Sequence, residues 1–446
     1  MKKKTIIITI EITSRELESK ILLASFFANN NFRVYLTTTT SLHILYNKLS
    51  SCIFFHKSTY EKKIDEIKKN LGAKIVFLDE ETGFAIPYSN MFSHCKNRFF
   101  PYITGDKYYA VFTLNKKYKY LLSDNCNSET KFYDTGWPRI DLWRKEFRNI
   151  NFKKINEIKI KYKSFYLMIS SFNVITEDIL NDRRQLYKNN PKQIAIEVDR
   201  FNAFQNYVKL IKELSIKLTV EEKIVIRPHP SENIGIWKKI FKNMSNIIFI
   251  KDEYTDAWLL SATSILQYAS TLGVQAAVYG IPSVQYKVKY QKGITDALTF
   301  DVSEHLTTSK AVLEFLRKKS HINNNLSVIN SISSLEGLLA SEKIVNILSK
   351  VDIKKENPVL LNKIDFLKAK PKHYLYILND LWSKLKRLGK PTFTMSVKEK
   401  RPNGLNKDEI YKKLNEFVVL QQGDIHSFKC DELANELICI EKKEKK

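Results

Sequence analysis

The chain has 446 residues, more than one ordinary hydrophobic core accommodates, so we expect at least two domains. Hydrophobic residues make up 43% of the chain and aromatic residues 12%, which excludes an intrinsically disordered protein. The 73 Lys and Arg residues against 48 Asp and Glu residues give a net charge of +25, which attracts anionic partners such as nucleotides, nucleic acid, acidic polysaccharide or an anionic membrane surface. An AT-rich genome, which enriches Lys, Asn and Ile, explains the same excess equally well.

The expected compartment follows from the cysteines and the apolar segments. Five cysteines lie scattered without a Cys-x-x-Cys pair, which argues against structural zinc and a disulfide scaffold and favours a reducing cytoplasm. The apolar stretch near the N-terminus stops at Glu11, too early for a signal peptide. Residues 257–286 carry no charge, but their Ser, Thr and Gln content favours a buried β-α-β segment over a membrane span. Any contact with the inner face of the membrane should therefore be peripheral.

Short apolar runs alternate with helical patterns in the first part of the chain. Residues 5–12 predict a strand, followed by a helix capped by Thr13 or Ser14. Further strands are predicted at residues 32–37, 52–56, 74–78, 110–113 and 132–135, with an amphipathic helix at 59–71. This alternation predicts a parallel, doubly wound sheet.

Charged side chains follow several of these strands. Glu11, Arg15 and Glu16 lie at the first strand-to-helix turn, and the carboxylates of residues 79–81 precede Gly83. Arg139 and Asp141 follow a Gly-Trp-Pro sequence that ends the last strand. The carboxylate cluster is open to three interpretations: metal ligation, a general base, or a solvated helix start; no nearby His spacing supports the metal. Glu16 is equally well explained as a helix cap.

A second series of elements follows a Lys-rich, Arg-rich linker at residues 144–163. A strand is predicted at 165–170, a polar insertion at 177–197, a helix at 201–214 and a strand at 246–250. After residue 299 the pattern becomes helical, most clearly at 310–318, 335–350 and 377–388. The last hundred residues are Lys-rich and contain no chemical motif.

The most informative stretch is residues 223–286. An apolar strand ends in Arg-Pro-His-Pro and brings Arg227 and His229 to its carboxyl end. A second strand is followed by a helix with Ser270 or Thr271 as its N-cap and Gly280 at its C-terminus. Because a helix N-terminus beside Arg and His side chains suits an anion, this stretch predicts a phosphate site. Nearby, Glu232 and Asn233 either cap the next helix or, in the case of Glu232, accept hydrogen bonds from a ribose; we favour the cap slightly.

These motifs, taken in order, carry a resemblance to a known family. They are residues 11–20 (EITSRELESK), 55–58 (FHKS), 78–83 (LDEETG), 136–141 (GWPRID), 227–233 (RPHPSEN) and 270–282 (STLGVQAAVYGIP). Over about residues 5–290 the chain resembles the bacterial surface carbohydrate biosynthesis proteins, GT-B glycosyltransferases similar to capsule-type transferases that have a His-Pro motif and use CMP-activated ulosonic acids. Trp137 and Gln275 depart from the family's usual pattern.

The resemblance implies an α/β protein of the GT-B-like class, with two Rossmann-like, doubly wound parallel-sheet domains facing a cleft. The expected domains are residues 1–150 for the acceptor, 160–320 for the nucleotide sugar, and 321–446 as a mainly helical extension. The implied function is a metal-independent glycosyltransferase of capsule or lipopolysaccharide synthesis. It would transfer an ulosonic acid from a CMP-linked donor to a glycan or lipid-linked glycan acceptor, with no other cofactor.

The expected site residues fall into three groups. The candidate catalytic carboxylates are Glu81 and Asp79, followed by Glu16. The candidate nucleotide-sugar ligands are Arg227, His229, Ser231, Glu232, Ser270, Thr271 and Gln275. The candidate cleft residues on the acceptor side are Glu11, Arg15, Lys57, Arg139 and Asp141.

Three alternatives stay open at this point: a nucleotide-sugar epimerase on the same fold, a CDP-polyol phosphotransferase, and a non-catalytic protein that binds anions or nucleic acid. The nucleic-acid alternative is weak because no basic motif interleaved with aromatic residues is present. The sequence does not predict an oligomeric state.

Overall fold

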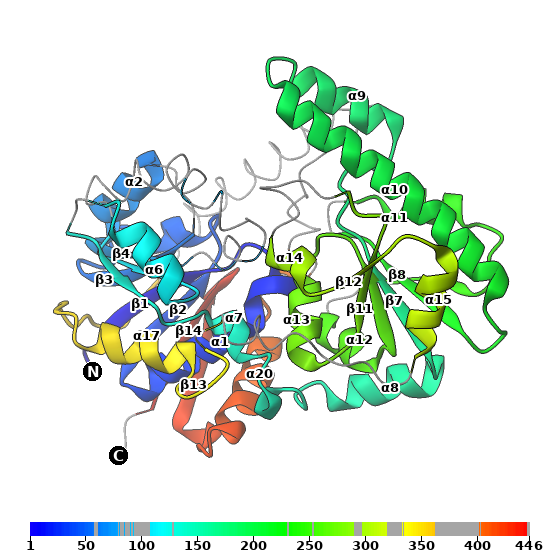
Figure 1. Cartoon of the computed structure of the whole chain (residues 1–446). Coiled ribbons are helices and arrows are strands. Elements are labelled where there is room, and N and C mark those ends of the chain that lie inside the picture. The colour runs from blue at the N-terminus through cyan, green and yellow to red at the C-terminus, as the bar shows by residue number, and fades with distance from the viewer. Residues whose placement is uncertain are drawn as a thin grey trace.

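The computed structural model contains two α/β domains, each built on a sheet of mostly parallel strands with helices packed against it (Figure 1). It describes residues 1–57, 61–78, 80, 84, 90, 92, 108–126, 129–229, 232–251, 254–289, 297–318, 332, 334–361, 401 and 403–443. A cleft lined by residues of both domains lies between the sheets. The arrangement confirms the predicted α/β, GT-B-like class.

The first sheet has the strand order β13-β14-β2-β1-β3-β4-β5-β6. Its parallel part consists of β1 (Lys4–Thr9), β2 (Phe32–Thr37), β3 (Cys52–His56), β4 (Ala73–Leu78), β5 (Ala110–Phe112) and β6 (Lys131–Tyr133). Every residue of β2 and β3 is buried, as expected for strands covered on both faces. This is why their continuous apolar runs could be located from the sequence.

Helices of the first domain lie between these strands or, in the case of α7 and η2, follow β6. They are α1 (Thr13–Asn29), α2 (Glu61–Leu71), α6 (Lys116–Ser123) and α7 (Pro138–Asp141), together with the 3₁₀ helices η1 (Leu42–Leu45) and η2 (Lys145–Phe147). The predicted cap of α1 was wrong, because the N-cap residue is Ile12 and makes no side-chain cap. Glu16 of the first turn instead accepts the backbone N–H of Glu11 at 2.9 Å.

The second sheet is fully parallel, with the order β12-β11-β10-β7-β8-β9. Its strands are β7 (Phe165–Ile169), β8 (Lys223–Arg227), β9 (Ile247–Phe249), β10 (Ser264–Gln267), β11 (Ser283–Tyr286) and β12 (Glu304–Leu306). Its short helices are α11 (Ile234–Ile240), α12 (Thr255–Ser261), α13 (Thr271–Tyr279), α14 (Leu298–Asp301) and α15 (Ser309–Arg317). The caps predicted for α13 are confirmed: Ser270 precedes it, and Gly280 ends it at a φ of 77°.

The uncharged segment of residues 257–286 lies within this domain and supplies most of α12 and all of β10, α13 and β11. Its charge-free composition therefore reflects burial between helices and sheet. Across the described part of the chain, no helix combines the length and the apolarity that a membrane crossing requires.

Two segments that the sequence predicted to be irregular are helical in the structure. The predicted linker contains α8 (Phe152–Tyr162). The predicted polar insertion forms α9 (Glu177–Leu186) and the start of the long α10 (Pro191–Lys217). Pro191 occupies the first turn of α10, where its missing N–H costs nothing, and Asn190 accepts the N–H of Gln193 at 3.1 Å. The polar composition of this segment concealed a pair of helices that project from the second domain (Figure 1).

The C-terminal region was expected to be mainly helical, and its described part differs from that expectation. It contains α17 (Ala340–Ser349), α20 (Lys407–Leu420), η3 (Ile425–Ser427) and a β-hairpin of β13 (Phe428–Ala434) and β14 (Leu437–Lys442). β14 pairs antiparallel with β2, placing Cys439 opposite Tyr35. The last strands of the chain thus complete the first sheet. The helix predicted at 377–388 lies outside the described residues.

This pairing makes a test of the C-terminal region possible. A chain that ends at residue 424 would keep α20 but would expose the edge of β2 and lose the fully buried side chains Ile438 and Ile440, each worth about 1.5–3 kcal/mol. We expect this chain to melt well below the full-length protein, or to aggregate. A chain that ends at residue 443 is the control and should melt like the parent. Equal melting temperatures for all three proteins would show that the hairpin is dispensable to the first domain.

Candidate functional site

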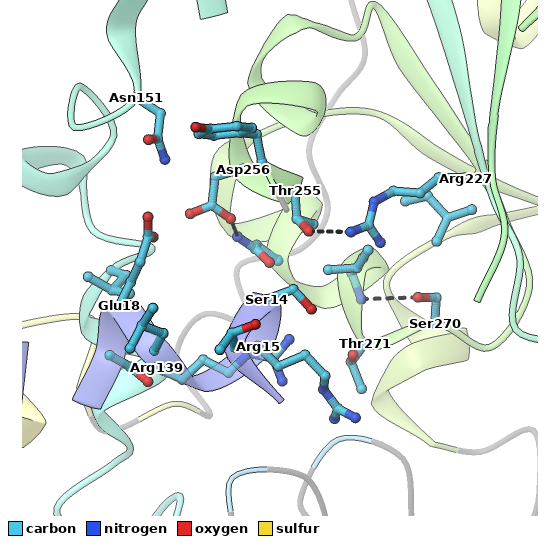
Figure 2. Close-up of a pocket in the computed structure, with 18 of the residues that line it drawn as sticks. Ser14, Arg15, Glu18, Arg139, Asn151, Arg227, Thr255, Asp256, Ser270 and Thr271 are labelled. Atoms are coloured by element: carbon cyan, nitrogen blue, oxygen red, sulfur yellow. Dashed lines mark hydrogen bonds between the residues drawn. The ribbon is translucent and has the colours of Figure 1, made fainter. Parts of the chain in front are cut away.

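The cleft between the two domains has a volume of about 670 Å³. One wall is formed by the start of α1 and by α7, and the opposite wall by the carboxyl ends of β7 and β8 with the starts of α12 and α13 (Figure 2). Residues of α20 line a third side. Six Arg or Lys side chains and three carboxylates lie among its described lining residues: Arg15, Arg139, Arg227, Lys251, Lys412 and Lys413 against Glu18, Asp256 and Glu409. The cleft is therefore suited to an anionic ligand.

The wall of the second domain brings together the predicted phosphate-binding residues. Ile169 at the end of β7 is in register with Arg227 on β8 and with Gln267 on β10, so three neighbouring strands end at one level. His229, Ser270 and Thr271 follow these strand ends and line the cleft.

Two hydrogen bonds fix the helix start and the arginine. Ser270 accepts the N–H of Leu272 at 3.3 Å, as an N-cap does. Arg227 donates from Nη2 to the hydroxyl of Thr255 at 2.6 Å, which turns its guanidinium toward α12. The wall therefore presents a cation, an imidazole and a helix N-terminus to the same space.

Gln275 also lines the cleft, one turn after the start of α13. Its side-chain N–H groups donate to Asp256 at 2.6 Å and to the Tyr279 hydroxyl at 2.9 Å. Gln275 thus orients Asp256, and its amide is committed to that carboxylate and to Tyr279.

Glu232 is placed in the protein interior, 3% exposed, where its carboxylate accepts hydrogen bonds from Ser170, the Asn173 backbone and Trp237 Nε1. Burial raises its pKa against the opposing effect of these donors. Glu232 is not among the described residues that line the cleft, so contact with a ribose there is not favoured. The carboxylate joins the loop after β7 to the loop after β8. Ser231 lies outside the described residues.

On the first-domain wall, Arg15 and Arg139 line the cleft as predicted, opposite Arg227, Ser270 and Thr271 (Figure 2). Glu11, Glu16 and Lys57 instead form an ion cluster, with Lys57 bonded to Glu16 and 2.9 Å from Glu11. Glu16 is buried in this cluster, 8% exposed. Its carboxylate is committed to Lys57 and to the start of α1, so we no longer expect it to act as a base.

The carboxylate cluster after β4 is described only at Glu80. Its carboxylate accepts hydrogen bonds from Lys20 at 2.5 Å and from the backbone N–H of Arg139 at 3.1 Å, so it holds α1 and α7 together. Asp79 and Glu81 lie outside the described residues, and their catalytic role stays a prediction.

Asp141, predicted to face the acceptor, is fully buried away from the cleft. It accepts the backbone N–H groups of Ala340 and Ser341 at 2.7 and 2.8 Å and the Ser341 hydroxyl at 2.8 Å, and so caps the start of α17. Burial raises its pKa to about 7, although these hydrogen bonds act in the opposite direction. The prediction was wrong because strand-end position alone does not reveal on which side of the sheet a helix will pack.

Glu18, Asp256 and Lys413 are among the cleft residues that sequence reasoning missed. Glu18 lies one helical turn after Arg15 and therefore on the same face of α1, a spacing that could have identified it. Asp256 is the last charged residue before the 30-residue uncharged segment, which is also a readable signal. Lys413 reaches Glu18 across 395 positions of sequence, and no local pattern reports such a contact. Within the described ranges, no group of three His, Cys, Asp or Glu side chains is arranged to hold a metal ion.

Comparisons with protein-family models and with curated proteins gave no match. Among solved structures, the UDP-GlcNAc 2-epimerase of Methanocaldococcus jannaschii is similar at 12% identity and a TM-score of 0.48, over 78% of this chain and 99% of that one. The S. aureus MnaA–UDP structure has 14% identity and a TM-score of 0.45, over 81% and 100% of the two chains. The wall teichoic acid polymerase TagF has 12% identity and a TM-score of 0.47, over 78% and 88%. Similarity at this level concerns overall architecture, and no function is inferred from it.

Proposed function

We propose that the protein is a glycosyltransferase of bacterial surface polysaccharide synthesis that transfers an ulosonic acid from a CMP-linked donor to a glycan acceptor. The observation that carries the proposal is the convergence of Arg227, His229 and the Ser270-Thr271 helix start on one wall of the interdomain cleft. A phosphate seated there would meet a planar guanidinium, an imidazole and the positive end of a helix dipole. These are the groups that bind a nucleotide phosphate and stabilise it as a leaving group.

The opposite wall supports a donor with a second negative charge. Arg15 and Arg139 line the cleft from the first domain and face the phosphate wall (Figure 2). An ulosonic acid carries a carboxylate on its anomeric carbon, close to the phosphate, so two separate cationic groups suit this donor better than a neutral sugar. In this proposal Arg227 and His229 hold the phosphate, while Arg15 or Arg139 holds the sugar carboxylate.

The acceptor would enter from the side of the first domain. Surface-glycan acceptors are commonly lipid-linked, and a net charge of +25 would attract the protein to an anionic membrane surface. A peripheral attachment of this kind belongs to the same proposal.

The first test is a thermal-shift panel of CMP, CDP, UMP, UDP and GDP, because a ligand that binds only the folded state raises the melting temperature. We expect CMP to stabilise the parent most. His229→Ala should weaken CMP binding by about 1.5–3 kcal/mol through loss of a hydrogen bond to phosphate. His426→Ala, which removes an exposed histidine of η3, is the matched control and should bind like the parent. Preferential stabilisation by UDP would favour an epimerase, and unchanged CMP affinity in His229→Ala would contradict the phosphate assignment.

A second test separates the sugar carboxylate from the nucleotide. Arg15→Gln and Arg139→Gln should weaken binding of CMP-N-acetylneuraminate and CMP-3-deoxy-manno-octulosonate, by roughly tenfold or more for the arginine that holds the carboxylate, because a charge-assisted hydrogen bond contributes about 1.5–3 kcal/mol. The affinity for CMP itself should stay close to that of the parent. Arg184→Gln, an exposed arginine of α9, controls for the loss of one positive charge. Calorimetric titration measures all three ligands, and equal losses for CMP and for the CMP-linked acids would place both arginines on the nucleotide instead.

A further inference from the structure

Asp256 occupies a distinctive position at the edge of the proposed phosphate site. It lies in the first turn of α12 and lines the cleft, and one carboxylate oxygen accepts a hydrogen bond from Gln275 of α13 at 2.6 Å. Its chain neighbour Thr255 accepts the hydrogen bond from Arg227. Asp256 is therefore linked through Gln275 to α13 and through Thr255 to Arg227, and both of these would hold the phosphate. Its carboxylate also lines the open cleft.

A second carboxylate approaches Asp256 from the other domain. Glu18 of α1 lines the same cleft, and Figure 2 shows its carboxylate facing that of Asp256, with Asn151 beside them. Lys413 of α20 lies 2.9 Å from Glu18 and donates to the Asn151 side-chain oxygen at 3.1 Å. The Lys413 side chain is 12% exposed and the Glu18 side chain 31% exposed, so solvent screens this ion pair only in part.

We propose that Asp256 is the catalytic base, that it takes the proton of the acceptor hydroxyl, and that Glu18 on the facing domain enforces this role through its negative charge. The inference rests on the proposed function and deepens it. As the acceptor oxygen forms its bond to the anomeric carbon, its proton passes to Asp256. The bond from that carbon to the phosphate oxygen breaks, and the nucleotide leaves with the electron pair.

The charges around Asp256 are consistent with this role. Burial and the charge of Glu18 raise its pKa to about 6, while the Gln275 hydrogen bond and the positive charges of Arg139 and Lys413 act in the opposite direction. Tyr279 is a further titratable neighbour, and burial and the charge of Asp256 raise its pKa well above the ordinary value. A carboxylate with a pKa near 6 is a stronger base than an ordinary aspartate, yet it is ionised at neutral pH. The turnover of the enzyme should therefore fall as the pH drops through about 6.

The experiment measures CMP release from CMP-N-acetylneuraminate and CMP-3-deoxy-manno-octulosonate with water as the acceptor, over a range of pH and corrected for release without enzyme. Asp256→Asn keeps the shape of the side chain and an oxygen that accepts the hydrogen bond from Gln275. The melting temperature, and its rise on CMP binding, should therefore be retained. Turnover should fall by about 10²–10⁴-fold. Asp408→Asn, which changes an exposed aspartate of α20, is the control for charge and should leave turnover unchanged.

Two further variants test, in opposite directions, how neighbouring charges affect the protonation of Asp256. Glu18→Gln removes the negative charge that favours protonation of Asp256, so the fall in rate on the acid side should move to lower pH by about one unit. Lys413→Met removes a positive charge, so the same fall should move to higher pH. A purely structural role of either residue would lower the melting temperature without moving the profile.

The outcomes distinguish the two proposals. If the parent releases CMP from neither donor, the proposed function is contradicted and the base assignment falls with it. If the parent is active and Asp256→Asn keeps near-parental turnover, the function stands and this inference is overturned. If the fall in rate on the acid side stays at the same pH in Glu18→Gln, the role proposed for Glu18 is refuted.

Discussion

The site depends on the common level at which β7, β8 and β10 end. The parallel register places Ile169 opposite both Arg227 and Gln267, so the loops that follow these strands open on one side of the sheet. A shift of one residue in β8 would turn Arg227 to the opposite face. Strands that are buried on both faces resist such a shift because apolar packing fixes them from both sides.

Buried polar groups hold in place the loops that follow these strands. The interior carboxylate of Glu232 joins the β7 and β8 loops, and Gln267 accepts the N–H of Ser270 at 2.8 Å to set the start of α13. Gly273 lies against the same glutamine: a Cβ there would approach Gln267 Nε2 to 2.6 Å. Close packing between α13 and β10 therefore orients the N-terminus of α13 toward the cleft.

The first domain supplies the facing wall, and the end of the chain completes its sheet. β14 extends the sheet beyond β2, while α20 packs on α1 and brings Lys413 to Glu18. Residues near both ends of the sequence thus meet at the cleft. Such an arrangement couples the integrity of the first domain to the electrostatics of the site, because Lys413 belongs to a helix that also contributes Phe417 to the core.

The sequence was informative wherever one physical signal dominated. Fully buried strands such as β2 and β3 appear as short apolar runs, and α13 was delimited by Ser270 and Gly280 because capping demands specific residue types. It was uninformative where distant partners decide the outcome. The roles of Glu232 and Asp141 depend on burial created by other segments, and the β14–β2 pairing joins residues about 400 positions apart. Helix α9 escaped recognition because it is mostly polar and buries only Ile179 and Leu180.

A crystal structure of the protein with CMP bound would test the proposed phosphate site most directly. We expect the CMP phosphate at the start of α13, within hydrogen-bonding distance of Arg227 and His229, and the space between Asp256, Glu18 and Arg15 left open for sugar and acceptor. A nucleotide bound elsewhere, or a phosphate in contact with neither Arg227 nor the N-terminus of α13, would contradict it.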